Sequence, residues 1–155
     1  MSKTNDDDYY AIALKYGQEF NGIEVQGGIG FSRRDGEDGD TDDTFGSVAV
    51  KFQSGFNIAF SAGSRENDGQ YGYGKLGYDR DLVNWGQTSF GVDYYQGTDF
   101  VSDGSTSEVL GIGISQDFDE ANTQIYLAYR AYQFDEDDTS YEDANALLFG
   151  MRVKF

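Results

Sequence analysis

Basic side chains recur on the polar side of stretches in which apolar and polar residues alternate. They are Lys15, Lys51, Lys75, Arg130, Arg152 and Lys154. Carboxylates occupy equivalent polar positions at Glu24, Asp93 and Asp117. The chain has no His and no Cys, which excludes His-based acid–base catalysis, thiol chemistry and the usual zinc sites. The role that remains for these groups is electrostatic. Charges of both signs can line a water-filled interior and pair with one another.

Paired carboxylates such as Glu24 and Asp93 can serve as the acid and base of a glycosidase. Nothing in the spacing of these two residues supports that role. We therefore expect a protein that is not an enzyme.

An acidic stretch at residues 35–43 carries six carboxylates in nine positions. Ca²⁺ takes clustered oxygen ligands, and Gly permits the tight turns that bring them together. Asp35, Asp38, Asp40 and Asp42 are the residues that would hold such an ion. Their spacing does not match the EF-hand pattern. We expect a solvated surface loop without a metal or cofactor, and Ca²⁺ binding at the acidic loops is the alternative.

The clearest alternation lies at residues 145–155. Counted back from Phe155 to Leu147, every second residue is apolar, and the interleaved residues are charged or small apart from Leu148. A period of two indicates a β-strand with two unlike faces. A strand of about ten residues with one apolar face is what a transmembrane barrel requires.

The same alternation predicts about nine strands along the chain. Their cores are residues 9–17, 23–31, 47–52, 56–62, 71–78, 90–95, 110–118, 125–132 and 145–155. Long connectors follow the second, fourth, sixth and eighth strands, and the others are shorter. Alternating short turns and long loops are typical of bacterial barrels. The sequence therefore predicts an all-β fold, an antiparallel up-and-down transmembrane β-barrel.

Composition limits the other classes. The 155 residues suit one domain, here 1–155, with a polar disordered tail at 1–8. A net charge of −17 argues against a nucleic-acid partner, and 16% aromatic residues argue against disorder. A mean hydropathy of −0.60 normally indicates a water-soluble protein. This inference does not hold for transmembrane β-barrels, because their polar lumen and loop residues lower the mean hydropathy despite an apolar lipid-facing surface.

Three stretches resemble one known family: residues 111–130, 90–95 and 73–78. Together with the terminal Phe155, they are similar to general diffusion porins of the Gram-negative outer membrane. Those porins are sixteen-stranded trimers of roughly twice this length. The resemblance implies that this chain is the C-terminal half of such a barrel.

The resemblance also implies a function and partners. It implies passive diffusion of small hydrophilic solutes and ions through the bacterial outer membrane. The implied partners are outer-membrane lipid, lipopolysaccharide, the barrel-assembly machinery and two further copies in a trimer. Phe155 would be the assembly signal. The implied pore-lining residues are Lys51, Lys75, Arg130, Arg152, Glu24 and Asp93.

Two alternatives stay open. Bacterial single-chain barrels have even strand numbers, so nine strands must close, oligomerise or join others. The chain could accordingly be a barrel fragment or mini-barrel that is a client of the assembly machinery. It could also be a soluble Ca²⁺-binding β-sandwich.

Overall fold

The computed structural model describes residues 8–36, 39–66, 68–137 and 139–155, which form a single sheet. The strands are β1 (Asp8–Phe20), β2 (Ile23–Asp35), β3 (Thr41–Lys51), β4 (Phe56–Arg65), β5 (Gln70–Val83), β6 (Gly86–Thr98), β7 (Ser105–Phe118), β8 (Thr123–Glu136), β9 (Thr139–Ser140) and β10 (Ala144–Val153). One 3-10 turn, η1 (Asp119–Ala121), joins β7 to β8. No helix of the described residues is long and apolar enough to cross a membrane.

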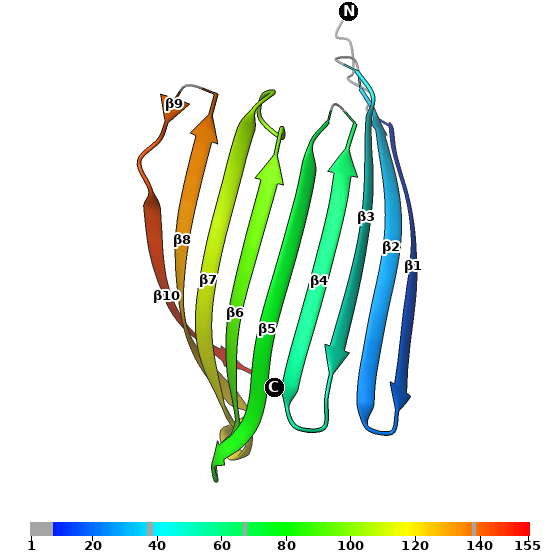
Figure 1. Ribbon diagram of the computed structural model, residues 1–155. Helices are drawn as coiled ribbons and strands as arrows, with labels where there is room; N and C mark the ends of the chain where they lie inside the picture. The colour runs from blue at the N-terminus through cyan, green and yellow to red at the C-terminus, as the bar shows by residue number, and fades with distance from the viewer. Residues whose placement is uncertain (1–7, 37–38, 67, 138) are drawn as a thin grey trace, which may run out of the picture.

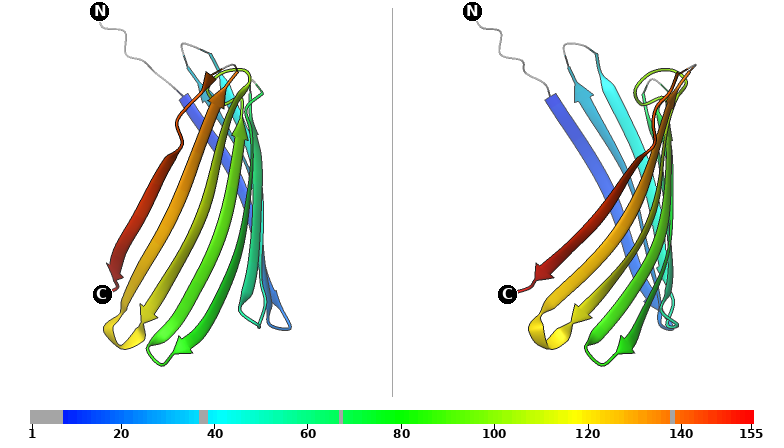
Figure 2. Two further views of the ribbon diagram at one scale, coloured as in Figure 1. Left: turned by 60° about the vertical axis from the view of Figure 1, so that its left-hand side comes forward. Right: turned by 90° about the vertical axis from the view of Figure 1, so that its left-hand side faces the viewer.

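The sheet is an up-and-down meander. Each strand pairs antiparallel with the next, in the order β1-β2-β3-β4-β5-β6-β7-β8-β10, and the short β9 pairs with β8. The strands curve together into an open trough (Figures 1 and 2). In the described part of the chain, β1 and β10 are not paired with each other. The predicted antiparallel barrel-type fold is confirmed, and the trough is a barrel wall that is not closed.

The described residues do not form a sandwich. A sandwich needs a second sheet packed on the first, with an apolar core between them. All described strands belong to one sheet, and none of the described apolar side chains is buried. The soluble β-sandwich alternative is therefore wrong.

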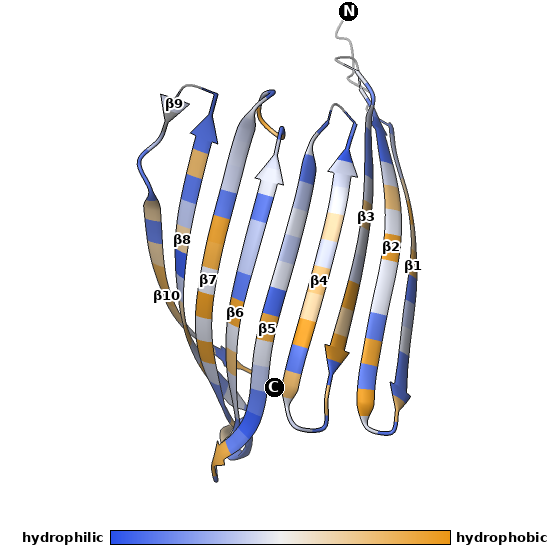
Figure 3. Ribbon diagram, viewed as in Figure 1, coloured by the Kyte–Doolittle hydropathy of each residue, from blue (hydrophilic) through white to orange (hydrophobic). Residues whose placement is uncertain are grey.

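Apolar and polar residues alternate along most strands (Figure 3). Because register partners on neighbouring strands share a face, the alternation adds up to continuous rows. One apolar row crosses the sheet through Val25, Val50, Ile58, Leu76, Val92, Ile112, Tyr129 and Leu147. The sheet thus has an apolar face and a polar face.

Tight turns end the strands at one end of the sheet. Asn21 and Gly22 connect β1 to β2 with φ of 50° and 74°, the left-handed pair that an Asn-Gly hairpin turn requires. Gly55, at φ 94°, closes the β3–β4 turn and donates its N–H to the Phe52 carbonyl at 2.9 Å. Both turns lie at connectors that the sequence predicts to be short.

Several strands are longer than the sequence predicts. The stretch 79–86 was expected to be a connector, but β5 continues to Val83 and β6 begins at Gly86. Asp79 and Arg80 pair in register with Ser89 and Thr88, so polar residues extend this hairpin. At the other end of the sheet, β1 begins at Asp8, the last residue of the predicted tail; residues 1–7 lie outside the described part.

Candidate functional site

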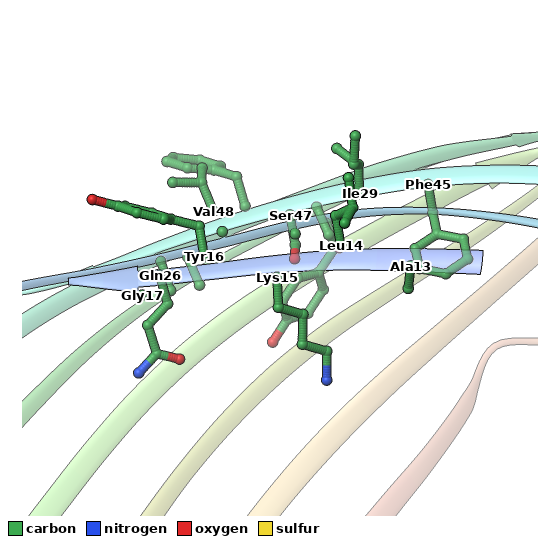
Figure 4. Close-up of a pocket in the computed structure, with 17 residues that line it drawn as sticks. Ala13, Leu14, Lys15, Tyr16, Gly17, Gln26, Ile29, Phe45, Ser47 and Val48 are labelled. Atoms are coloured by element: carbon green, nitrogen blue, oxygen red, sulfur yellow. The ribbon is translucent and has the colours of Figure 1, made fainter.

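The polar face of the sheet is its concave face. Figure 4 shows Lys15 and Gln26 pointing to the side towards which the later strands curve, whereas Tyr16, Val48 and Ile29 point away from it. Side chains in register with Lys15 and Gln26 therefore line the inside of the trough. The apolar rows cover its convex outer face.

Three of the predicted pore-lining residues lie in one row of the concave face. Lys75 of β5 pairs in register with Asp93 of β6, Asp93 pairs with Gly111 of β7, and Gly111 pairs with Arg130 of β8. Arg130 and Asp93 form an ion pair at 3.5 Å that passes over Gly111. We call Lys75, Asp93 and Arg130 the charged row.

Glycines make the charged row possible. A Cβ on Gly111 would lie 2.6 Å from Asp93 Oδ1, so any larger residue would push the carboxylate out of its place. In the neighbouring row, Gly91 and Gly113 are register partners and add no side chains on β6 and β7. These glycines form part of the floor of a recess of about 230 Å³, with Lys75, Asp93 and Arg130 on its wall. The recess therefore presents charges of both signs above exposed backbone.

A second ion pair lies nearer the tight-turn end. Lys51, the last residue of β3, approaches Asp79 of β5 with its Nζ 2.9 Å from Oδ2. Glu24 is the register partner of Lys51 on β2 and shares its face. Lys51 and Glu24 therefore lie on neighbouring strands of the same face, and Asp79 is the residue that forms the ion pair with Lys51.

Arg152 stands apart from these groups. It lies on β10 as the register partner of Gln124, on the concave face and exposed. Lys15 also lies on that face, beside Gly28. Neither residue joins the charged row. Phe155 follows the end of β10 and is fully exposed.

The acidic stretch is not wholly the loop that the sequence predicts, because Asp35 ends β2 and Thr41 begins β3. Its described carboxylates gather around Arg33. Arg33 forms ion pairs with Asp35 at 2.5 Å, with Asp42 at 3.6 Å, and with Asp40. Asp38 lies outside the described residues. In the described ranges, no group of three acidic side chains is arranged to hold a metal ion. Asp35, Asp40 and Asp42 thus have Arg33 as a shared partner.

Sequence reasoning missed two members of the concave face. Asp79 lies just beyond the predicted strand at 71–78 and Tyr73 lies within it, and neither is among the predicted pore-lining residues. Tyr73 lies within electrostatic range of Asp93 and Arg130. Continuing the period of two from Lys75 in both directions reaches Tyr73 and Asp79, so the signal was present in the alternation.

Comparison with protein families gives one match. A family model described as Gram-negative porin matches residues 1–138. Among curated protein sequences, none matches this chain.

Several solved structures share this fold, among them one of an outer-membrane protein, OmpT of Vibrio cholerae. The chain superposes on OccAB3 of Acinetobacter baumannii with a TM-score of 0.72 at 10% identity, covering 94% of this chain and 49% of that one. OccK9 (OpdG) of Pseudomonas aeruginosa gives 0.66 at 13% identity, covering 94% and 46%. OmpT of Vibrio cholerae gives 0.63 at 12%, covering 92% and 55%. At these identities the likeness shows the fold, and the chain spans about half the length of these proteins.

Proposed function

Because this chain belongs to the Gram-negative porin family of the bacterial outer membrane, we propose that it forms part of the wall of an outer-membrane channel. The channel passes small hydrophilic solutes and ions passively, without catalysis or a cofactor. Its selectivity comes from the geometry and charge of the lumen wall.

One observation carries this proposal: the division of the sheet into an apolar convex face and a charged concave face. A barrel wall in lipid must present apolar side chains outward and satisfy its backbone within the sheet. Apolar groups cover the convex face, while the charged row crosses the middle of the concave one. The concave face would thus line water and the convex face would contact lipid and lipopolysaccharide.

The residues proposed to line the pore share the concave face and carry charge. They are Lys51, Lys75, Arg130, Arg152, Glu24 and Asp93. Charges of both signs on one wall set a local field that acts on ions and dipolar solutes. Removing the basic members should leave the acidic ones dominant and shift the channel towards cations.

The chain as a whole would be one porin-like domain that contributes strands to a larger barrel. Every described pairing is antiparallel, and the edges at β1 and β10 need partners in lipid. We further propose a homotrimeric assembly and recognition of Phe155 by the barrel-assembly machinery. Deleting Phe155 should slow insertion into membranes that contain this machinery; an unchanged rate would contradict the recognition.

The reversal potential across a planar bilayer in a salt gradient tests the channel proposal. The chain is refolded into lipid, and Lys51→Gln, Lys75→Gln, Arg130→Gln and Arg152→Gln are combined. The potential should move towards that of a cation-selective pore. The control exchanges Lys75→Arg and Arg130→Lys, which keep the charge and should keep the selectivity. Unchanged potential in the neutralised variant would contradict a lumen role for these residues.

A further inference from the structure

The convex face carries a hollow near the tight-turn end of β4–β7. Its volume is about 550 Å³, within the range of about 300–1,000 Å³ typical of ligand sites. We call it the convex hollow. The residues that define it are Phe56, Leu76, Tyr78, Phe90, Val92 and Ile112. Phe56 and Tyr78 pack with their ring centroids 4.6 Å apart, so part of its wall is a fixed aromatic pair.

A polar row borders the convex hollow on the side of the tight turns. Arg80 follows Tyr78 by two residues on β5 and therefore shares its face. Its register partner is Thr88, and Thr88 pairs in turn with Gln116. The Thr88 hydroxyl donates to Gln116 Oε1 at 2.5 Å, and the Gln116 amide donates to the Gly86 carbonyl at 3.0 Å. These polar groups are thus satisfied within the sheet.

Arg80 differs from its neighbours in this row. It is exposed, and the described part of the chain offers it no hydrogen bond or ion pair. Arg33, Arg65 and Arg130 all have carboxylate partners. Arg80 thus places an unpaired guanidinium beside the apolar residues of the convex face, near its tight-turn end.

The position of Arg80 corresponds to a membrane interface. This inference rests on the proposed function: in a bacterial barrel the tight turns lie at the periplasmic end, which would put Arg80 at the level of the periplasmic headgroups. An aromatic pair, Trp85 and Phe118, stacks close to this row with centroids 5.6 Å apart. Aromatic rings concentrate at such interfaces. A ligand that reaches both the hollow and Arg80 must be apolar at one end and anionic at the other.

We propose that the convex hollow and Arg80 together bind one phospholipid with an anionic headgroup from the periplasmic leaflet. An acyl chain lies against Leu76, Val92 and Ile112, and the headgroup phosphate accepts hydrogen bonds from the Arg80 guanidinium, whose planar fork suits phosphate. The chain has a net charge of −17, which repels anionic lipid overall. A preference for such lipid therefore requires a local cation, and Arg80 supplies it.

Quenching of a single tryptophan by brominated lipid tests the site. Trp85 is the only Trp, so Trp85→Phe with Phe90→Trp places the reporter in the hollow wall. The chain is refolded into phosphatidylcholine bilayers containing either dibrominated phosphatidylglycerol or dibrominated phosphatidylcholine. One interfacial cation contributes about 1 kcal/mol to anionic lipid binding, which corresponds to roughly fivefold preference for phosphatidylglycerol. Equal quenching by the two lipids would overturn the proposal.

Variants distinguish lipid binding at this site from a general attraction of anionic lipid to positive charge. Arg80→Gln should reduce the preference to about one, and Arg80→Lys should retain most of it. Lys154→Gln removes a charge beyond the same end of the sheet and should leave the preference intact. Val92→Phe fills the hollow and should reduce quenching by both lipids. A preference that survives Arg80→Gln, or that falls equally with Lys154→Gln, would contradict the site. The quenching measurement does not require an open channel. A failure of the reversal-potential experiment would therefore not affect its interpretation.

Discussion

At the scale of single residues, the ion pair on the concave face depends on the position of a glycine. Gly111 separates Asp93 from Arg130 in register, and its lack of a Cβ lets the two side chains meet across β7 at 3.5 Å. Gly113, two residues on, faces the same side but has room, because an added Cβ would meet only Ala128 and backbone at 3.5 Å or more. Two neighbouring glycines on one strand thus have different roles.

This difference predicts unequal effects of the same substitution. Gly111→Ala should destabilise the folded chain by about 1–3 kcal/mol, because the new methyl displaces Asp93 and breaks a paired charge. Gly113→Ala should change stability by less than about 0.5 kcal/mol. Urea unfolding in lipid vesicles, followed by Trp85 fluorescence, measures both. Equal losses would mean that the ion pair over Gly111 contributes nothing.

A carboxylate outside the spanning part of the sheet links two loops at the opposite end. Glu136 accepts hydrogen bonds from the Ser102 hydroxyl and, at 3.1 Å, from the Tyr141 hydroxyl. The Tyr141 ring packs against Phe134 with centroids 5.0 Å apart. The hydrogen bonds from Ser102 and Tyr141 lower the pKa of Glu136, and the bond to Glu136 raises the pKa of Tyr141.

The lowered pKa of Glu136 sets the sign of a pH effect. A carboxyl whose folded pKa is depressed stabilises the fold above its unfolded pKa and loses that contribution as pH falls through the folded value. Hydrogen-exchange protection of residues 99–104 should therefore decrease at acid pH after correction for intrinsic rates. Glu136→Gln should remove the titration, so a variant with the same acid-induced loss would contradict this role.

At the scale of strands, the alternation of apolar and polar residues determines the fold. It also determines which face contacts lipid and which face contacts water. Ile112 is 61% exposed on the convex face near the middle of β7, and Ser115 lies on the concave face of the same strand. In water an exposed apolar row of this length would aggregate, whereas in lipid it is the stable arrangement.

A charge scan of β7 should show this division. Ile112→Lys should cost about 2–4 kcal/mol, the penalty of a cation at the lipid face near the membrane centre, and Ser115→Lys about 0–1 kcal/mol. Unfolding midpoints in vesicles measure both variants. If Ser115→Lys were as costly as Ile112→Lys, the concave face would not be in contact with water.

The alternation was enough to predict the strands and which residues share a face. It did not predict the connector lengths, because the connector after β4 (66–69) is no longer than the one after β3 (52–55). It underestimated strand lengths, because polar residues such as Asp79 and Arg80 read as a loop, while their register partners Ser89 and Thr88 hold them in a hairpin. That pairing depends on a neighbouring strand and is not visible within either segment alone.

Contacts across the concave face were less predictable. Lys75, Asp93 and Arg130 are far apart in sequence, and only the register brings them into one row. A slip of one residue would move any of them to the other face. The pairing of Lys51 with Asp79 depends in the same way on registers that composition does not encode.

At the scale of the whole molecule, the described edge strands β1 and β10 lack the strand partners that a barrel in lipid requires. β1 and β10 run in the same direction in Figure 1, so direct closure would make a parallel pair in an otherwise antiparallel sheet. The proposal that further strands lie between these edges avoids that pair.

Cross-linking should distinguish the two arrangements. Ala13→Cys with Ala146→Cys, one residue on each edge strand, should form no disulfide within one chain in bilayers. Ala128→Cys with Leu148→Cys are register partners on β8 and β10 and serve as the positive control. An efficient disulfide between positions 13 and 146 would mean that the chain closes on itself.

The most direct test is the water accessibility of adjacent positions in the membrane. The chain has no Cys, so single cysteines can be introduced at Lys75, Leu76, Val92 and Asp93 and treated with a membrane-impermeant maleimide in sealed bilayers. Positions 75 and 93 on the concave face should react, and positions 76 and 92 on the convex face should be protected by lipid. Equal reaction at all four, or the reverse pattern, would contradict a water-filled lumen bounded by this sheet.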